Sequence, residues 1–155
     1  MLFSIASQAG SVIAIGGNIT AVLPIVKGSE VDLYYDDGVH HNAFSLFPTK
    51  PFDLGIYAED SSKYVKFEKT GRVALYCNIH PKVMSAILVL NNPFYAVSDD
   101  KGKFSISGIP DAEYTLRTWR KRSDTANLPI SLSQIQTMQI DLDLTDGKDN
   151  RPTQK

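Results

Sequence analysis

The close spacing of turn residues is the feature that most limits how this chain can fold. Short apolar or alternating runs are separated by glycine, proline and aspartate, as in residues 16–18, 36–38 and 70–71. No stretch shows the 3.6-residue period of an amphipathic helix. Many short strands bounded by such turn signals are typical of a sandwich or barrel. We therefore predict an all-β chain that folds as a Greek-key sandwich or barrel.

The predicted strands of this sandwich lie in the first 90 residues. We expect them at 2–6, 11–15, 19–26, 30–35, 43–47, 52–57, 62–67, 72–77 and 85–90. Polar and apolar residues alternate with period two in 30–35, which predicts a strand with one buried face. The run 85–90 is continuously apolar, which favours a position covered on both sides.

The pattern changes after Asn91-Asn92-Pro93, which marks a natural boundary. A hairpin is predicted over 94–106, followed by strands within 114–120 and 128–144. The last residues are polar and form a tail. We therefore expect a first domain over 1–90, a small β module over 91–145 and a flexible tail over 146–155.

Composition excludes several classes of function. The 155 residues carry a formal net charge of -1, with 21% charged residues, so there is no basic field to attract nucleic acid. No apolar stretch reaches the length that spans a bilayer, so no membrane span is expected. The single cysteine excludes an intramolecular disulfide. Residues 2–15 have no positively charged leader and do not read as an intact signal peptide.

One eight-residue stretch, from Cys77 to Met84, combines a thiolate, the imidazole of His80 and a thioether. Two histidines, one cysteine and a weak axial methionine are the donor set of blue-copper electron-transfer sites. The missing imidazole has two candidates, His40 and His41. Neighbours on a strand face opposite sides, so only one of these two can point at the metal. The residue types therefore predict copper as the cofactor.

Cys77 also admits other interpretations. A lone cysteine is often a small buried hydrophobe. Zinc also takes Cys and His, although a structural zinc site needs four strong donors and methionine is a poor one. A nucleophilic Cys–His pair is conceivable, but no oxyanion-hole motif accompanies it. We favour copper because Cys77, His80, Met84 and a distant histidine occur together in one β-rich chain.

Residues 41–46, His-Asn-Ala-Phe-Ser-Leu, together with residues 77–81, Cys-Asn-Ile-His-Pro, resemble the cupredoxins. The resemblance runs from about residue 27 to residue 119. Within it, the ligand motif is similar to that of bacterial cupredoxin-like proteins of the methylamine-utilisation type. It implies a cupredoxin sandwich with His41, Cys77, His80 and Met84 as the metal ligands. It also implies that Asn42 ties the two ligand segments together near the sulfur. Three residues separate Met84 from His80, a spacing that differs from plastocyanin and amicyanin.

Residues 92–104 and 108–116 resemble the small prealbumin-like β domains related to carboxypeptidase regulatory regions. The cupredoxin resemblance implies a mononuclear type 1 copper protein that is not an enzyme and carries single electrons, whereas the resemblance of the second module implies no function. A redox partner protein is expected to dock near His80, and the family resemblance implies a periplasmic location. Two alternatives stay open: a copper-binding or delivery protein, and a β interaction module with a degenerate site.

Overall fold

The computed structural model describes residues 11–14, 22–34, 39–57, 61, 63–79, 83–97, 104–117 and 127–132. Every regular element within these ranges is a β-strand, and none is a helix, so the all-β prediction is confirmed. The strands are β1 (Ser11–Ala14), β2 (Val22–Val26), β3 (Glu30–Tyr34), β4 (His41–Ser45), β5 (Phe52–Tyr57), β6 (Lys63–Lys66), β7 (Gly71–Tyr76), β8 (Val83–Leu90), β9 (Ala112–Arg117) and β10 (Asn127–Leu132). Where the structure is described, no helix is long and apolar enough to cross a membrane.

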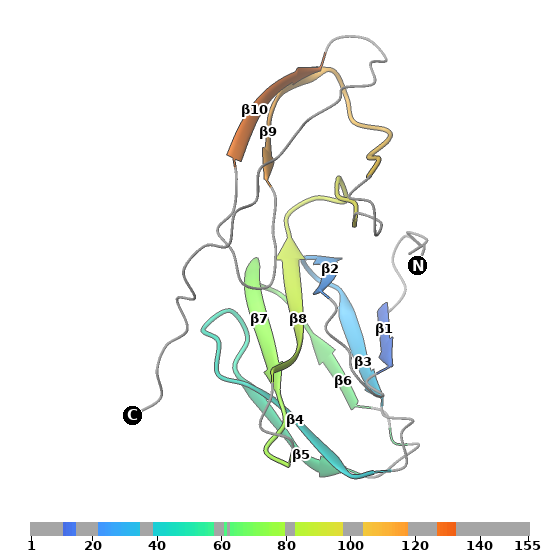
Figure 1. Cartoon of the computed structure of the whole chain (residues 1–155), viewed down its shortest axis with the longest axis vertical. Coiled ribbons are helices and arrows are strands. Elements are labelled where there is room, and N and C mark those ends of the chain that lie inside the picture. The colour runs from blue at the N-terminus through green and yellow to red at the C-terminus, as the bar shows by residue number, and fades with distance from the viewer. Residues whose placement is uncertain are drawn as a thin grey trace. The chain divides into compact units, whose positions relative to one another are not determined.

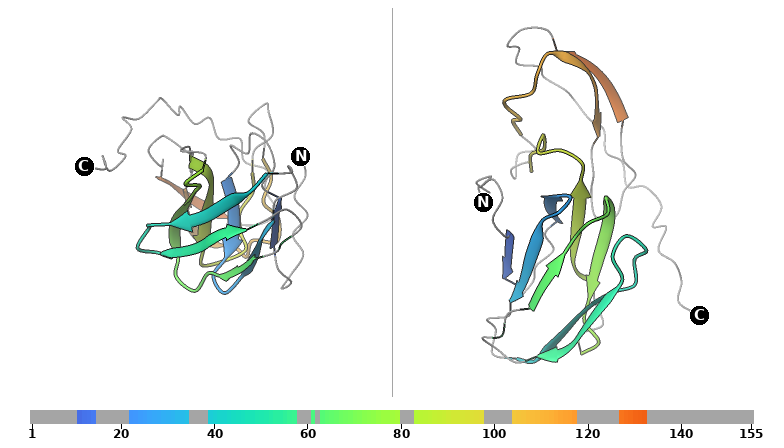
Figure 2. Two further views of the ribbon diagram at one scale, coloured as in Figure 1. Left: turned by 90° about the horizontal axis from the view of Figure 1, so that it is seen from below. Right: turned by 180° about the vertical axis from the view of Figure 1, so that it is seen from behind.

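The described residues of the first compact unit, residues 1–106, form two sheets. One has five strands in the order β2-β8-β7-β4-β5, and Figure 1 shows β8 between β7 and β2. The other has three strands in the order β1-β3-β6, seen at the front of the right panel of Figure 2. The pairs β1–β3 and β2–β8 are parallel, and the remaining pairs are antiparallel. Parallel neighbours need a crossover connection. Between the parallel strands β1 and β3 of the three-stranded sheet, the chain contributes β2 to the five-stranded sheet.

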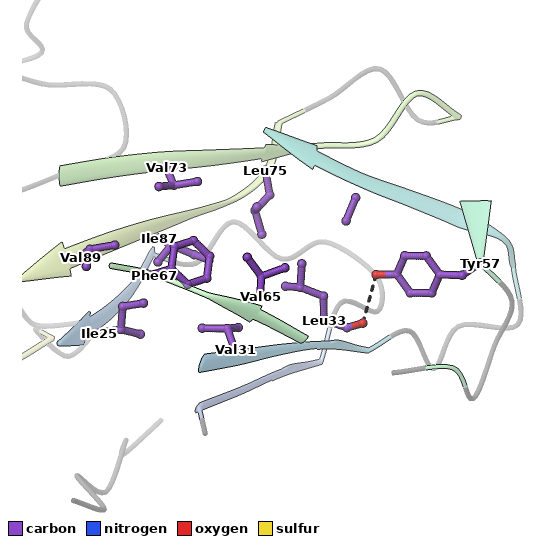
Figure 3. Close-up of a cluster of buried hydrophobic side chains, with 11 residues drawn as sticks. Ile25, Val31, Leu33, Tyr57, Val65, Phe67, Val73, Leu75, Ile87 and Val89 are labelled. Atoms are coloured by element: carbon purple, nitrogen blue, oxygen red, sulfur yellow. Dashed lines mark hydrogen bonds between the residues drawn. The ribbon is translucent and has the colours of Figure 1, made fainter. Parts of the chain in front are cut away.

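The core of this unit lies between the two sheets. In β3, Val31 and Leu33 are buried while Glu30 is exposed, which confirms the predicted period-two strand. Figure 3 shows these side chains packed against those of the five-stranded sheet. The largest members of the cluster are Ile25, Val31, Leu33, Tyr57, Val65, Phe67, Val73, Leu75, Ile87 and Val89. Because both sheets contribute their inner faces to one core, the predicted sandwich is confirmed.

The second compact unit comprises residues 107–155, so the division falls after Ile106, whereas the sequence places it after residue 90. Its strands β9 and β10 pair antiparallel and overlap the predicted strands within 114–120 and 128–144. The described parts of the predicted hairpin, residues 94–97 and 104–106, are not strands, so that prediction is wrong. The chain bends over residues 91–93, and the Tyr95 N–H donates to the Pro93 carbonyl at 3.0 Å. The resemblance to prealbumin-like modules stays a prediction, and the tail over 146–155 lies outside the described residues.

Candidate metal centre

Strand β4 delivers one imidazole to the interior. His41 is its first residue and is only 6% exposed, whereas the preceding His40 is exposed. The strand lies between β5 and β7 in the five-stranded sheet, which buries Asn42 and Ala43 as well. Of the two histidines that the sequence offers, His41 is therefore the one that faces the protein interior.

Strand β7 delivers the thiol. Cys77 directly follows β7 and is 2% exposed. Strands β4 and β7 pair antiparallel, with Phe44 opposite Tyr76 and their ring centroids 5.6 Å apart. Because Tyr76 is the last residue of β7 and pairs with Phe44, the end of β7 lies beside β4. The sheet thus brings a histidine and a cysteine together from segments far apart in the sequence.

The distance between these two side chains fits a shared metal ion. Cys77 Sγ lies 3.8 Å from His41 Nδ1, across 36 residues of sequence. A first-row ion such as zinc binds sulfur at about 2.3 Å and imidazole nitrogen at about 2.0 Å, so donors set at about 120° would be about 3.7 Å apart. The soft thiolate and the imidazole are also the donor types that copper prefers. The donor pair therefore fits the metal that the sequence predicts.

Asn42 joins the two donor segments through its side-chain amide. Its Oδ1 accepts a hydrogen bond from the Asn78 N–H at 3.4 Å, which links β4 to the residue after Cys77. This is the tie that the resemblance implies for Asn42. Its Nδ2 donates to Asp53 Oδ1 at 2.7 Å, a contact that the sequence does not predict. Asn42 is only 2% exposed, and these two hydrogen bonds pair both ends of its buried amide.

The other two predicted ligands stay predictions. His80 lies outside the described residues, and Met84 is described only in its backbone. That backbone is informative, because Leu75 pairs with Ser85 while Tyr76 pairs with Val83, which leaves Met84 as one extra residue in β8. The register shift is a β-bulge in the backbone of β8. Among the described residues, no cluster of three His, Cys, Asp or Glu donors occurs.

Two residues near the site, Tyr57 and Asp53, were not predicted from the sequence. Tyr57 lies opposite His41 in the register of β4 and β5, and its hydroxyl donates to the Leu33 carbonyl of the other sheet at 3.1 Å. Asp53 holds the amide of Asn42. A signal for Asp53 is present in the chain, because Gly55 interrupts a strand pattern and such a glycine suggests a bulge. No comparable local signal marks Tyr57.

No protein-family model matches the sequence, and no curated protein matches it. Among solved structures, the chain is similar to a purple cupredoxin from Nitrosopumilus maritimus, with 24% identity, 52% of this chain and 99% of that chain covered, and a TM-score of 0.45. It is similar to a copper(I) form of an amicyanin variant, with 15% identity, 55% and 86% covered, and a TM-score of 0.47. A copper-containing nitrite reductase from Thermus scotoductus SA-01 matches with 19% identity, 55% of this chain and 23% of that chain covered, and a TM-score of 0.48. At these scores the similarities describe a resemblance in β architecture and carry no conclusion about activity.

Proposed function

We propose that this protein is a mononuclear type 1 copper protein that carries single electrons between redox partners. The observation that carries the proposal is the buried pair of donors, Cys77 Sγ and His41 Nδ1, 3.8 Å apart on neighbouring strands. In the proposed site His80 would supply the second imidazole and Met84 a thioether. Copper, when bound to such a donor set, supplies a one-electron couple.

The β frame supports this function because it fixes the donors that it carries. His41 stands on β4 between two hydrogen-bonded neighbours, and Cys77 adjoins the end of β7. Both side chains are buried in a close-packed interior, which resists displacement. An electron carrier needs ligands that move little when the charge changes, and buried donors on a sheet meet that need.

Docking of a redox partner protein near His80 is part of the proposal. In the described residues that flank the site, Ile79 is 44% exposed and Val39 is 45% exposed. Exposed apolar side chains at the mouth of a site suit a short-lived encounter with another protein. The periplasm is the proposed location, and it rests on the family resemblance alone.

The proposal is tested by loading the purified chain with cupric ion and recording its visible spectrum. A strong thiolate-to-copper charge-transfer band is expected, with one copper per chain and a reversible one-electron wave in voltammetry. Cys77→Ala and His41→Ala should abolish the band. The matched control is His40→Ala, which changes an exposed neighbour of His41 and should leave the band intact.

Three results would contradict the proposal. A chain that shows no such band with cupric ion, or a band that survives Cys77→Ala, would exclude a type 1 site. Copper that binds but shows no reversible redox wave, and that passes rapidly to a chelator, would indicate a delivery protein instead.

A further inference from the structure

We propose that Asp53 is a positioning residue, which orients the amide of Asn42 and through it the peptide that follows Cys77. Its consequence at copper rests on the function proposed above, whereas its effect on the protein backbone does not. Asp53 belongs to β5, at the edge of the five-stranded sheet, and its side chain is exposed. Its side chain accepts hydrogen bonds from Asn42 Nδ2 and from the Gly55 N–H, so its action on the donor pair passes through Asn42.

The orientation of Asn42 follows from hydrogen-bond chemistry. The two ends of an asparagine amide are nearly identical in shape, so its partners decide which end is the oxygen. An ionised carboxylate only accepts, so Asp53 Oδ1, 2.7 Å away, selects the NH₂ end of Asn42. The opposite end, Oδ1, then faces the Asn78 N–H at 3.4 Å. Asp53 thereby determines that the Asn78 N–H meets an acceptor.

A one-residue bulge in β5 places Asp53 for this contact. Phe44 pairs with Asp53, so an uninterrupted register would set Asn42 opposite Gly55, yet Asn42 pairs with Ile56. Gly55 has a φ of 67°, a left-handed conformation that suits a bulge glycine. The Gly55 N–H donates to Asp53 Oδ1 at 2.9 Å, so the oxygen that holds Asn42 is itself anchored by the bulge. Asp53, Gly55 and Asn42 thus form one hydrogen-bonded unit.

The consequence reaches the thiol through the backbone. The Asn78 N–H belongs to the peptide group directly after Cys77, so its orientation is coupled to the backbone angle that aims the Cys77 side chain. Without the carboxylate, the Asn42 amide is free to turn over. In the turned-over orientation its NH₂ group would face the Asn78 N–H, and two donors cannot bond each other, so only part of the Asn42 population would keep this bond. The separation of Cys77 Sγ and His41 Nδ1 would lose one of its supports.

The first test uses the full chain without metal and follows the exchange of the Asn78 amide hydrogen by NMR. Asp53→Ala is expected to speed this exchange about tenfold, the change that corresponds to loss of one hydrogen bond. Asp53→Asn keeps a side-chain oxygen at the same place and should restore slow exchange. Glu68→Ala removes an exposed carboxylate elsewhere and serves as the control. Unchanged exchange in Asp53→Ala would overturn the proposal.

A double-mutant cycle with Asn42→Ala tests whether Asp53 acts through Asn42. Each single variant should speed Asn78 exchange, and the double variant should add nothing further. Additive effects would show that Asp53 acts by another route and would refute the proposal.

With copper bound, Asp53→Ala should shift the charge-transfer band and the reduction potential, while Asp53→Asn and Glu68→Ala leave both near the values of the unmodified chain. A protein that takes up no copper would refute the proposed function, and the metal-free exchange data would still decide the role of Asp53. A shift of equal size in Glu68→Ala would indicate a general charge effect and would count against positioning.

Discussion

Replacing Tyr57 by phenylalanine removes a single hydroxyl group that links the two sheets of the sandwich. The hydroxyl, on β5 of the five-stranded sheet, donates to the Leu33 carbonyl of β3 in the three-stranded sheet at 3.1 Å. Figure 3 shows this bond reaching across the core. Tyr57 is 6% exposed and Leu33 is fully buried, so water cannot easily replace the lost donor. The change leaves the aromatic ring in place and therefore isolates the hydrogen bond.

The expected loss follows from the energetics of such bonds. A typical intramolecular hydrogen bond contributes about 1 kcal/mol net, and a buried carbonyl that loses its donor adds to this cost. We expect Tyr57→Phe to lower the free energy of unfolding by about 1–2 kcal/mol. In a unit of this size each kcal/mol corresponds to about 4 °C, so the melting temperature should fall by about 4–8 °C.

The assay is chemical and thermal unfolding followed by circular dichroism, with Tyr64→Phe as the matched control. Tyr64 is 63% exposed, and loss of an exposed hydroxyl should change stability by less than about 0.5 kcal/mol. Equal stability of Tyr57→Phe and Tyr64→Phe would refute the conclusion that this hydroxyl joins the sheets.

Two further predictions concern glycine and pH. Gly71 has a φ of 133°, and a Cβ added there would lie 2.8 Å from Thr49 Oγ1, whereas Gly55 has a φ of 67° and open space around it. Gly55→Ala should lower the free energy of unfolding by about 1–2 kcal/mol in denaturant unfolding. Gly71→Ala should lower it further, because it adds a steric clash to the backbone strain. Adding Thr49→Ala should recover part of the loss in Gly71→Ala only, and no recovery would contradict the steric argument. Burial raises the pKa of the Tyr95 hydroxyl above its usual 10.0. Above that pH the unfolded chain loses this proton more readily than the folded chain does. The free energy of unfolding should therefore fall as the pH rises above 10.0. Unfolding curves on both sides of that pH should show a smaller fall for Tyr95→Phe, and an equal fall would exclude the contribution.

The placement of strands could be predicted because its signals are local. Residues 52–57 are predicted as a strand and form β5, and the alternating run from Glu30 forms β3 with Val31 and Leu33 buried. Period-two alternation and turn residues act within a few positions, so they can be read without knowledge of the partner strand. The hairpin predicted over 94–106 failed because turn residues alone do not supply the pairing that makes a strand.

The sequence by itself determined the donor chemistry of the candidate site. Cys77 and the histidines are visible as residue types in a β pattern, and the family resemblance singles out His41. Only the tertiary structure decided that Cys77 Sγ and His41 Nδ1 meet at 3.8 Å, and that Asp53 holds Asn42. These contacts depend on how β4 pairs with β5 and β7, a non-local choice in which one extra residue changes which side chains meet. Chemistry resides in single residues, whereas distance and register exist only after distant segments have packed together.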